Sequence, residues 1–357
     1  MEDIFKALPY SLAKNEKEAF YNQRIHELNL LHAENCAEYK RILISLNYDF
    51  DRISHFHESP FLPVRLFKYY DLLSVPRKSI VKTLTSSGTS GQAVSKIFLD
   101  KQTAMLQTKA LSNIVSSIIG KKRAPMLIID EPNVITNRNN FSARGAGILG
   151  FSLFGTKREY ALDEQMELRI EAIQAFLQKH EGSRIFLFGF TFMIFQHFLR
   201  ALEDLNINLD LSDAVLIHGG GWKKLIDQKI DSSQFRKRLY NCCGINSVFD
   251  YYGMVEQTGS IHMECEEGFL HAPVYGDVIV RRPSDFSCAE LGETGILQTL
   301  SLLPLSYPGH SLLTEDEGFI VGEDDCKCGR LGKYFKIIGR LKSAEVRGCS
   351  DTYETRS

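Results

Sequence analysis

The sequence predicts an α/β fold whose mainly parallel central sheets are flanked by helices, and three observations support this. From about residue 80 onwards, short apolar runs alternate with amphipathic segments, as expected of strands that are connected by helices. Three polar, glycine-rich loops follow strand-like runs, and open α/β sheets bind ligands at such loops. Between about 268 and 340 the apolar runs are shorter and turns are more frequent, which predicts a smaller β-rich subdomain.

Four regions are expected along the chain. Residues 1–75 form a helical region, because apolar side chains recur at helical spacing from Glu16 to Tyr39. Residues 76–267 form the α/β core, residues 268–340 the β-rich subdomain, and residues 341–357 a tail. Within the core we expect these elements: strands at Met126–Asp130, Ala214–His218 and Val248–Tyr252, and a helix at Gln165–Lys179.

Composition narrows the function classes. Of the 357 residues, 44% are hydrophobic and 24% are charged, as in ordinary globular proteins, and the net charge of −2 provides no general attraction to nucleic acid. The acidic start, Met1-Glu2-Asp3-Ile4, lacks the pattern of a secretory signal. Eight cysteines in such a chain indicate thiols, metal ligands or a nucleophile rather than a disulfide framework. We therefore expect a cytoplasmic location.

The most apolar stretch is Ile185–Phe195. It is too short to span a bilayer, which takes about 20 residues, so we expect no membrane insertion. Its aromatic and β-branched content predicts a buried strand that runs into a helix. A pocket for an amphiphilic ligand, lined by Phe188, Gly189 and Phe190, is the alternative.

The first glycine-rich loop can wrap a polyphosphate. Glycines let the backbone approach an anion closely, and hydroxyl groups add hydrogen-bond donors. No Gly-Lys-Ser/Thr follows, so the loop is not a Walker A loop, and a solvated turn is the alternative. The candidate phosphate-binding residues are Ser86, Ser87, Gly88, Thr89, Ser90 and Gly91.

This loop resembles the phosphate loop of the adenylate-forming superfamily, and four more motifs resemble that superfamily in the expected order. His218-Gly219-Gly220-Gly221-Trp222 is similar to the loop that packs on adenine in the phenylacetate–CoA ligase branch. Tyr251-Tyr252-Gly253-Met254-Val255-Glu256 resembles the motif whose aromatic ring and glycine lie near the nucleotide and whose Glu, here Glu256, holds Mg²⁺. Val255 replaces the usual Thr.

The last two motifs resemble the ribose and hinge segments of the same superfamily. Leu313–Gly318 contains Asp316, which the resemblance places on both ribose hydroxyls. Ile338–Lys342 contains Arg340, implied to lie near ribose and phosphate, and Lys342 at the hinge. The chemistry agrees, because a carboxylate that attacks the α-phosphate of ATP builds up negative charge that Mg²⁺, loop donors and a cation offset.

The tail resembles that of one subfamily. Residues 341–357 are too few for the C-terminal lysine domain of the superfamily, so we expect that domain to be absent. Arg347-Gly348-Cys349-Ser350 is similar to the tail of the acyl-protein synthetases of bacterial bioluminescence operons, in which a cysteine near the C-terminus accepts the acyl group. Arg347 would lower the pKa of the Cys349 thiol. An ordinary exposed cysteine is the alternative.

Four further side chains suit tetrahedral Zn²⁺ in a structural rather than catalytic site, because four protein ligands leave no open position. They are Cys265, His271, Cys326 and Cys328. Their spacing is not that of a standard zinc ribbon. His262-Met263-Glu264 resembles the His-x-Glu of zinc deaminases only superficially, because no Pro-Cys-x-x-Cys follows. Cys242 and Cys243 are expected to be buried apolar residues.

The resemblance implies an ATP-dependent ligase that converts a carboxylic acid, a fatty acid in this subfamily, to an acyl-adenylate. The acyl group then passes to a protein thiol, with release of pyrophosphate and AMP, and an acyl reductase is the implied partner. One alternative is a phenylacetate-type acyl–CoA ligase. The other is a non-catalytic nucleotide-binding subunit that scaffolds a reductase complex, for which Val255 leaves room.

Overall fold

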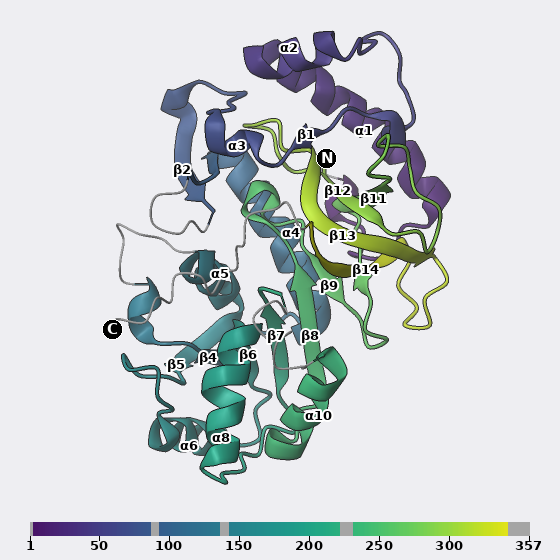
Figure 1. The fold of residues 1–357 in the computed structure, drawn as a ribbon. Helices are drawn as coiled ribbons and strands as arrows, with labels where there is room; N and C mark the ends of the chain where they lie inside the picture. Colours follow the sequence, from purple (N-terminus) through teal and green to yellow (C-terminus); the bar gives the residue numbers. More distant parts are fainter. Residues whose placement is uncertain (1–2, 87–92, 136–142, 222–230, 342–357) are drawn as a thin grey trace. The chain divides into compact units, whose positions relative to one another are not determined.

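The computed structural model describes residues 3–86, 93–135, 143–221 and 231–341. The chain divides into two compact units (Figure 1). Of the described residues, the first unit comprises 3–86, 93–114 and 252–341, and the second comprises 115–135, 143–221 and 231–251. The predicted four-part division of the chain stays a prediction. None of the helices in the described ranges is long and apolar enough to cross a membrane.

The second unit is built on parallel strands, as the sequence predicts. Their order is β5-β4-β6-β7-β8, and every neighbouring pair is parallel. The strands are β4 (Ala124–Ile129), β5 (Gly155–Tyr160), β6 (Phe186–Phe190), β7 (Val215–Gly219) and β8 (Ser247–Tyr252). The three strands predicted in this region correspond to β4, β7 and β8, with ends that differ by no more than two residues.

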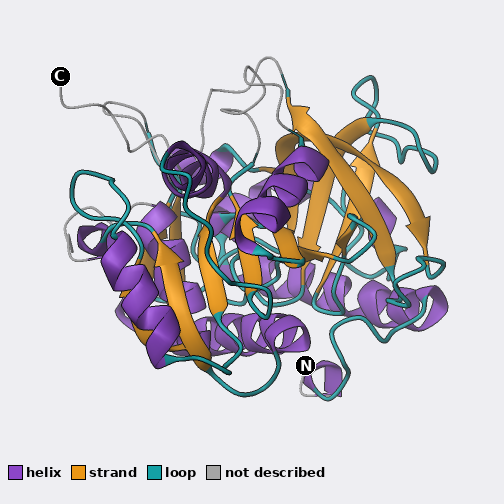
Figure 2. Cartoon of the chain, turned by 90° about the horizontal axis from the view of Figure 1, so that it is seen from below, coloured by secondary structure: helices purple, strands orange, loops and turns teal. Residues whose placement is uncertain are grey.

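Helices cover both faces of these strands (Figure 2). They are α5 (Ala143–Phe151), α6 (Ile170–Lys179), α7 (Thr191–Met193), a π-helical turn (Ile194–Leu199), α8 (Arg200–Asp204) and α10 (Ser232–Cys243). The apolar run at 185–195 is thus a strand that leads into helix, as predicted. Helix α6 begins five residues later than predicted, because the Asp163 carboxylate accepts the amide N–H groups of Gln165 and Glu167 and holds this segment in a turn.

The core of the second unit follows from the alternation of side chains along each strand. Leu127, Leu187 and Leu216 lie on one face, packed against Phe198 and Phe235 from the covering helices. Phe188 lies on the other face, stacked on Phe151 of α5. Cys242 and Cys243 are buried in the same cluster as the three leucines, which confirms the prediction that they are buried apolar residues.

The first unit contains the β-rich stretch predicted from 268 onwards. Its strands follow the order β11-β12-β13-β14-β10-β9, and neighbours are antiparallel. They are β9 (His262–Glu264), β10 (Leu270–His271), β11 (Gly276–Arg281), β12 (Gly295–Ser301), β13 (Ser311–Glu323) and β14 (Lys333–Arg340). Strand β1 (Leu62–Pro63) pairs with β13, while β2 (Ile80–Thr85) and β3 (Lys96–Asp100) form a separate hairpin.

The N-terminal helical region contains a break at Cys36. The stretch from Glu16 to Tyr39, with its helical spacing of apolar side chains, is divided between α1 (Lys14–Asn35) and α2 (Ala37–Ser45), because Cys36 between them adopts an extended backbone with φ of −132°. Helix α1 packs its Tyr21 and Ile25 against Ile279 and Leu300 of the strands. The remaining helices of this unit are α3 (Leu66–Tyr69) and α4, whose range Lys101–Ile119 continues into the second unit.

Short 3-10 helices complete the description. They are η1 (Asp3–Phe5), η2 (Phe56–Glu58), η3 (Arg77–Ser79), η4 (Pro132–Ile135), η5 (Ser152–Phe154) and η7 (Val255–Gln257).

Candidate functional site

Asp316 and Arg340, predicted from separate motifs, are direct cross-strand partners on β13 and β14. Arg340 Nε donates to Asp316 Oδ1 at 3.3 Å, and Tyr252 Oη donates to Asp316 Oδ2 at 2.8 Å. Both carboxylate oxygens therefore accept a hydrogen bond. Burial, followed by the charge of Asp316, raises the pKa of Tyr252 well above its ordinary value, so the phenol stays protonated and can donate. We refer to Tyr252, Glu315, Asp316 and Arg340 as the Asp316 cluster.

Glu315 extends this cluster with a second acid–base contact. One oxygen of its carboxylate accepts a hydrogen bond from Arg65 Nε, and the other oxygen lies 3.6 Å from an Arg340 guanidinium nitrogen. Only 23% of the Arg340 side chain is exposed, so its charge is screened less than that of a surface arginine. Arg340 thus bridges two neighbouring carboxylates and is held in one orientation.

Glu256 lies in the short helix η7 and is almost completely buried, with 6% exposure. Burial raises the pKa of its carboxyl group, while a hydrogen bond from Ser95 and the charges of Lys68 and Arg340 oppose that shift. Because burial of an anion is costly without a compensating charge, a cation bound by this carboxylate would stabilise the ionised form. The site therefore fits the Mg²⁺ ligand that the motif implies.

Ser86, at the start of the predicted phosphate loop, is tied to Ser95 after its end. The amide N–H of Ser95 donates to Ser86 Oγ at 2.9 Å, and the amide N–H of Ser86 donates to the Ser95 carbonyl at 3.1 Å. Since Ser95 also bonds Glu256, both ends of this segment lie beside the candidate magnesium ligand. The loop residues Ser87, Gly88, Thr89, Ser90 and Gly91 lie outside the described residues, as do Lys342 and Cys349.

In the second unit, Gly219 ends β7 directly opposite Tyr251 on β8. A Cβ atom at Gly219 would lie 2.5 Å from Tyr251 Cε1, so only glycine permits this ring position. Gly220 and Gly221 follow with φ of 99° and 72°, a left-handed backbone that favours glycine. The glycines of this motif are thus required by local geometry. Gly253, the glycine of the following motif, is exposed directly after β8.

His218, which precedes these glycines, has a local structural role. It is fully buried, and the hydroxyl of Thr191 lies 2.9 Å from its Nδ1 while donating its own proton to the Gly219 carbonyl at 3.0 Å. Burial lowers the pKa of His218 to about 3, so the imidazole is neutral. His218 is therefore a strand-end histidine whose Nδ1 is hydrogen-bonded within the second unit.

The residues expected to line an acid pocket are divided between two faces of β6. Phe188 and Phe190 share one face, with ring centroids 5.9 Å apart, and Phe188 stacks on Phe151 at 4.2 Å. Gly189 faces the other way, towards Ile129 and Ile194. The two phenylalanines, but not Gly189, can therefore lie along the same side of a pocket.

The four predicted zinc ligands converge, although they come from separate parts of the first unit. One ligand atom from each of Cys265, His271, Cys326 and Cys328 lies within 4.8 Å of all the others. Cys265 Sγ is 4.0 Å from Cys326 Sγ, and Cys328 Sγ is 3.4 Å from His271 Nε2. Three of the four side chains are buried. We refer to these residues as the Cys/His cluster; its donors are those that zinc prefers.

Two aromatic side chains to which sequence reasoning assigned no role pack against the ring of Tyr252. The Tyr252 ring stacks on His262 of β9 with centroids 6.0 Å apart, and it meets Phe335 of β14 edge-on at 6.4 Å. His262 and Phe335 also pack on each other at 5.2 Å. We refer to this pair as the aromatic wall. No motif marks it, because a single histidine or phenylalanine in a strand has no distinctive pattern.

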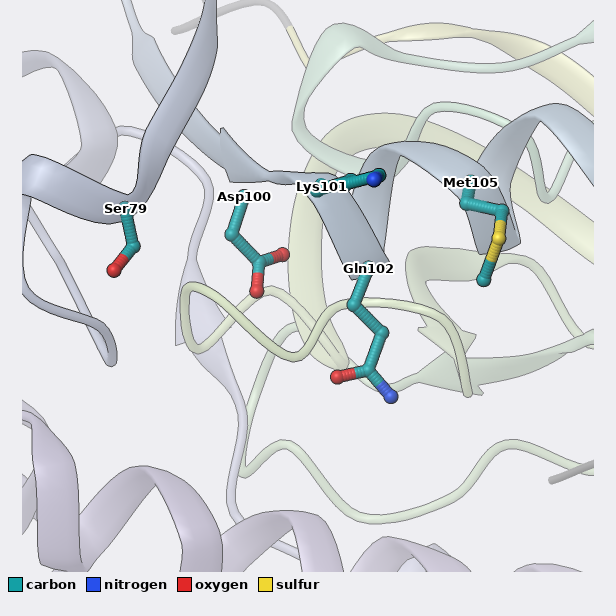
Figure 3. A pocket seen from close by; sticks show the side chains of 5 residues that line it. All are labelled: Ser79, Asp100, Lys101, Gln102 and Met105. Atoms are coloured by element: carbon teal, nitrogen blue, oxygen red, sulfur yellow. The ribbon is translucent and has the colours of Figure 1, made fainter.

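An open hollow of about 340 Å³ lies elsewhere in the first unit (Figure 3). Its lining side chains come from the end of β3, the first turn of α4 and the neighbouring η3: Ser79, Asp100, Lys101, Gln102 and Met105. Asp100 already accepts the amide N–H of Thr103 at 2.8 Å and so caps α4. Because none of the predicted site residues lines this hollow, we do not assign the chemistry to it.

Comparison with known proteins identifies relatives of the whole chain. The family model described as acyl-protein synthetase, LuxE, matches residues 1–356. A long-chain-fatty-acid–luciferin-component ligase of Aliivibrio fischeri is 24% identical over 361 residues, covering 97% of this chain and 91% of the relative. The ligase of the same name from Vibrio harveyi is 23% identical over 353 residues, covering 97% and 90%.

Solved structures show the same fold. An open conformation of 2-hydroxyisobutyryl-CoA ligase in complex with 2-HIB-AMP and CoA has a TM-score of 0.71 and 15% identity, covering 93% of this chain and 71% of that one. The same ligase in the postadenylation state with R3-HIB-AMP has a TM-score of 0.69 and 15% identity, covering 93% and 69%. At this identity the likeness shows the fold alone, which is the adenylate-forming ligase fold predicted from the motifs.

Proposed function

Because the chain belongs to the acyl-protein synthetase family, LuxE, we propose that its substrate is a long-chain fatty acid and its acceptor a protein thiol. ATP-dependent activation of an acyl group and its transfer to a protein are the chemistry of this ligase. The finer proposal draws on the names of the two relatives, which specify a long-chain fatty acid. The observation that carries it is the match over residues 1–356, within which Tyr252, Asp316 and Arg340 form one hydrogen-bonded cluster.

In the proposed adenylation step, a fatty-acid carboxylate oxygen attacks the α-phosphorus of ATP and pyrophosphate leaves. Asp316 binds the ribose hydroxyls and Tyr252 keeps its carboxylate in place. Arg340, which already bridges two carboxylates, offers its remaining guanidinium protons to phosphate oxygens. Ser86 begins the loop that holds the phosphates, and the assignment of Gly219, Gly220 and Gly221 to the adenine ring rests on their sequence motif.

The proposed cofactors are ATP with Mg²⁺, and Zn²⁺ in the Cys/His cluster. Glu256 would hold Mg²⁺, which neutralises charge on the phosphate oxygens. The buried carboxylate of Glu256, bonded to Ser95 beside the loop, supports this assignment. Zinc would have a structural role, because four protein ligands leave no open coordination position. A cytoplasmic location, where ATP is available, belongs to the same proposal.

In the proposed transfer step, the Cys349 thiolate attacks the carbonyl carbon of the acyl-adenylate, AMP leaves, and a thioester forms. The acyl group then moves from Cys349 to a partner protein, for which an acyl reductase is the proposed candidate. The support for Cys349 is its sequence context, with Arg347 two residues away. Because the family transfers acyl groups to proteins, this proposal stands ahead of free CoA as the acceptor and of a non-catalytic scaffold.

Pyrophosphate exchange into ATP, dependent on added acid, tests the proposal. We would assay fatty acids from short to long chains together with aryl acids, with Asp316→Asn as the matched inactive variant. Exchange that requires a long-chain fatty acid supports the proposed substrate. Exchange with aryl acids only would contradict the fatty-acid assignment, and folded protein that binds ATP but exchanges with no acid would contradict the adenylation step.

A further inference from the structure

We propose that the Cys/His cluster holds one ion of the zinc class, and that this ion fixes the aromatic wall behind Tyr252. The inference rests on the proposed function, because it gives the ion a task in positioning the Asp316 cluster for nucleotide. It concerns only residues of the first unit. Its two parts are the existence of the metal centre and its connection to Tyr252.

The distances within the cluster are close to those of a tetrahedral site. Zinc bonds of about 2.0–2.3 Å at tetrahedral angles hold ligand atoms about 3.5–3.8 Å apart. Cys265 and Cys326 sulfurs are 4.0 Å apart, and the contact from Cys328 to His271 is 3.4 Å. Small side-chain movements would therefore complete the coordination. The three sulfurs and one imidazole nitrogen exclude the oxygen-seeking ions Mg²⁺ and Ca²⁺.

The backbone around the cysteines brings their side chains together. Tight turns at Cys265–Gly268 and Cys326–Gly329 each close with an amide-to-carbonyl bond of 3.0 Å. Two short turns thus present their sulfurs to one point.

The position of His271 suits ligation of an ion through Nε2. Its ring is buried, stacked on Tyr334 with centroids 5.5 Å apart and covered edge-on by Tyr10 at 6.0 Å. Nε2 lies 3.4 Å from the Cys328 sulfur, and Nδ1 has no hydrogen-bond partner within the described part of the chain. A neutral imidazole with its proton on Nδ1 presents the Nε2 lone pair to the three sulfurs, which is the form that ligates zinc.

The strands that carry the cluster also carry the aromatic wall. In β10, His271 pairs with Met263 of β9 and with Tyr334 of β14. His262 precedes Met263 in β9, and Phe335 follows Tyr334 in β14. Each residue of the wall is therefore the strand neighbour of a pairing partner of His271, and its side chain points to the opposite face of the sheet from that of His271. An ion that ties β10 to the turns after β9 and before β14 would fix the spacing of these strands, and with it the rings that contact Tyr252.

Metal content is the first measurement. We expect about one zinc per chain in the purified wild type and its loss in Cys326→Ser and in His271→Gln. The matched control is Cys288→Ser, which changes a partly buried cysteine of the same unit outside the cluster and should keep the metal. Wild type that contains no metal, or that contains a disulfide between Cys265 and Cys326, would overturn the metal centre.

ATP affinity, measured by calorimetry without acid or acceptor protein, tests the connection to Tyr252. Removal of zinc by a chelator should weaken ATP binding about tenfold, and added zinc should restore it in the same sample. This reversibility separates the effect from unfolding. His262→Ala should keep the metal and also weaken ATP binding, because it removes half of the wall.

Unchanged ATP affinity after verified zinc removal would overturn the connection to Tyr252. A different result would contradict the proposed function. Zinc-loaded wild type that binds ATP normally but shows no pyrophosphate exchange would contradict the adenylation proposal and leave the inference standing. Zinc-loaded wild type that binds no ATP would overturn both the proposed function and the positioning role, while the metal content would still establish the centre.

Discussion

Tyr252 Oη donates a hydrogen bond of 2.8 Å to Asp316 Oδ2 across 64 residues of sequence. One residue ends β8 and the other lies in the middle of β13. The bond connects two motifs that the sequence shows only as separate patterns. It also gives the Tyr252 hydroxyl a partner that phenylalanine, which fills the same space, could not bind.

The substitution Tyr252→Phe should weaken ATP binding about tenfold, because hydrogen bonds to charged groups contribute about 1.5–3 kcal/mol and part of this is recovered by Arg340. Calorimetric titration with ATP measures the change. Tyr240→Phe, at a tyrosine that is 55% exposed, is the matched control and should bind as the wild type does. Equal affinity in both variants would show that the phenol does not hold Asp316 for nucleotide.

The magnesium requirement should depend on pH through Glu256. Burial raises the pKa of this carboxyl group above its ordinary value of 4.5. The protonated form is thus favoured without a cation: its contribution to stability is complete below pH 4.5 and is lost as pH rises through the raised pKa. Mg²⁺ needs the carboxylate, so the Mg²⁺ concentration for half-maximal exchange should rise as the pH is lowered through the raised pKa.

Pyrophosphate exchange as a function of Mg²⁺ at several pH values between 5.5 and 7.5 measures this effect. The Glu256→Gln variant should need a higher Mg²⁺ concentration for half-maximal exchange. It should also lose the pH dependence that comes from protonation of the Glu256 carboxylate. Protonation of ATP itself affects both proteins equally. Glu290→Gln, at an exposed position, should behave as the wild type. A Mg²⁺ requirement that Glu256→Gln leaves unchanged would rule out Glu256 as the ligand.

The substitution Cys349→Ser should separate the two proposed half-reactions. Acid-dependent pyrophosphate exchange should continue near the wild-type rate, because the thiol acts only after the acyl-adenylate has formed. Stable labelling of the protein by radioactive fatty acid should disappear, since a serine hydroxyl is a far weaker nucleophile than a thiolate. Cys288→Ser should keep both activities. Acyl label that stays on the Cys349→Ser protein would place the acceptor elsewhere.

The stability of the first unit should fall in acid because of His32. This histidine is fully buried, with Nδ1 2.7 Å from Ser74 Oγ, and burial lowers its pKa from 6.5 to about 3. A lowered pKa means that the unfolded chain binds the proton more readily, so the contribution is present above pH 6.5 and is lost as pH falls towards 3. The loss approaches about 1.4 kcal/mol per pH unit.

Urea unfolding at pH 7.5 and 5.5 measures this dependence. We expect His32→Gln to reduce the difference between the two pH values by about 1 kcal/mol, because one proton is no longer taken up on unfolding. His26→Gln, which changes a half-buried histidine of the same helix, is the control. A pH difference identical in wild type and His32→Gln would contradict the assignment.

Much of the fold could be predicted because its signals are local. The run Met126–Asp130 is apolar on both faces, as a buried parallel strand must be, and it is found as β4. Gly219 could be recognised from its motif, although the reason for glycine, the close approach of Tyr251, is visible only in the structure. The break at Cys36 was not predicted, because neither proline nor glycine marks it.

The assembly of the site depends on register, which no local pattern specifies. Asp316 meets Arg340 because β13 and β14 pair with shifts between Glu317 and Gly318 and between Ile320 and Gly322. Without these two irregularities a different pair of residues would face each other. For the same reason the aromatic wall could not be predicted, since His262 and Phe335 come together only through the pairing of β10 with both of their strands.

The two filled acceptor positions of Asp316 have a consequence for the choice of nucleotide. A site discriminates strongly against a substrate that lacks one hydroxyl when the group that would bind it is left buried and unpaired. Asp316 keeps Tyr252 and Arg340 as donors whichever sugar arrives. We therefore expect this enzyme to accept 2′-deoxyATP with only a modest loss of efficiency. Its selectivity between ATP and 2′-deoxyATP should be weak, so the concentrations of the two nucleotides would determine which one is used.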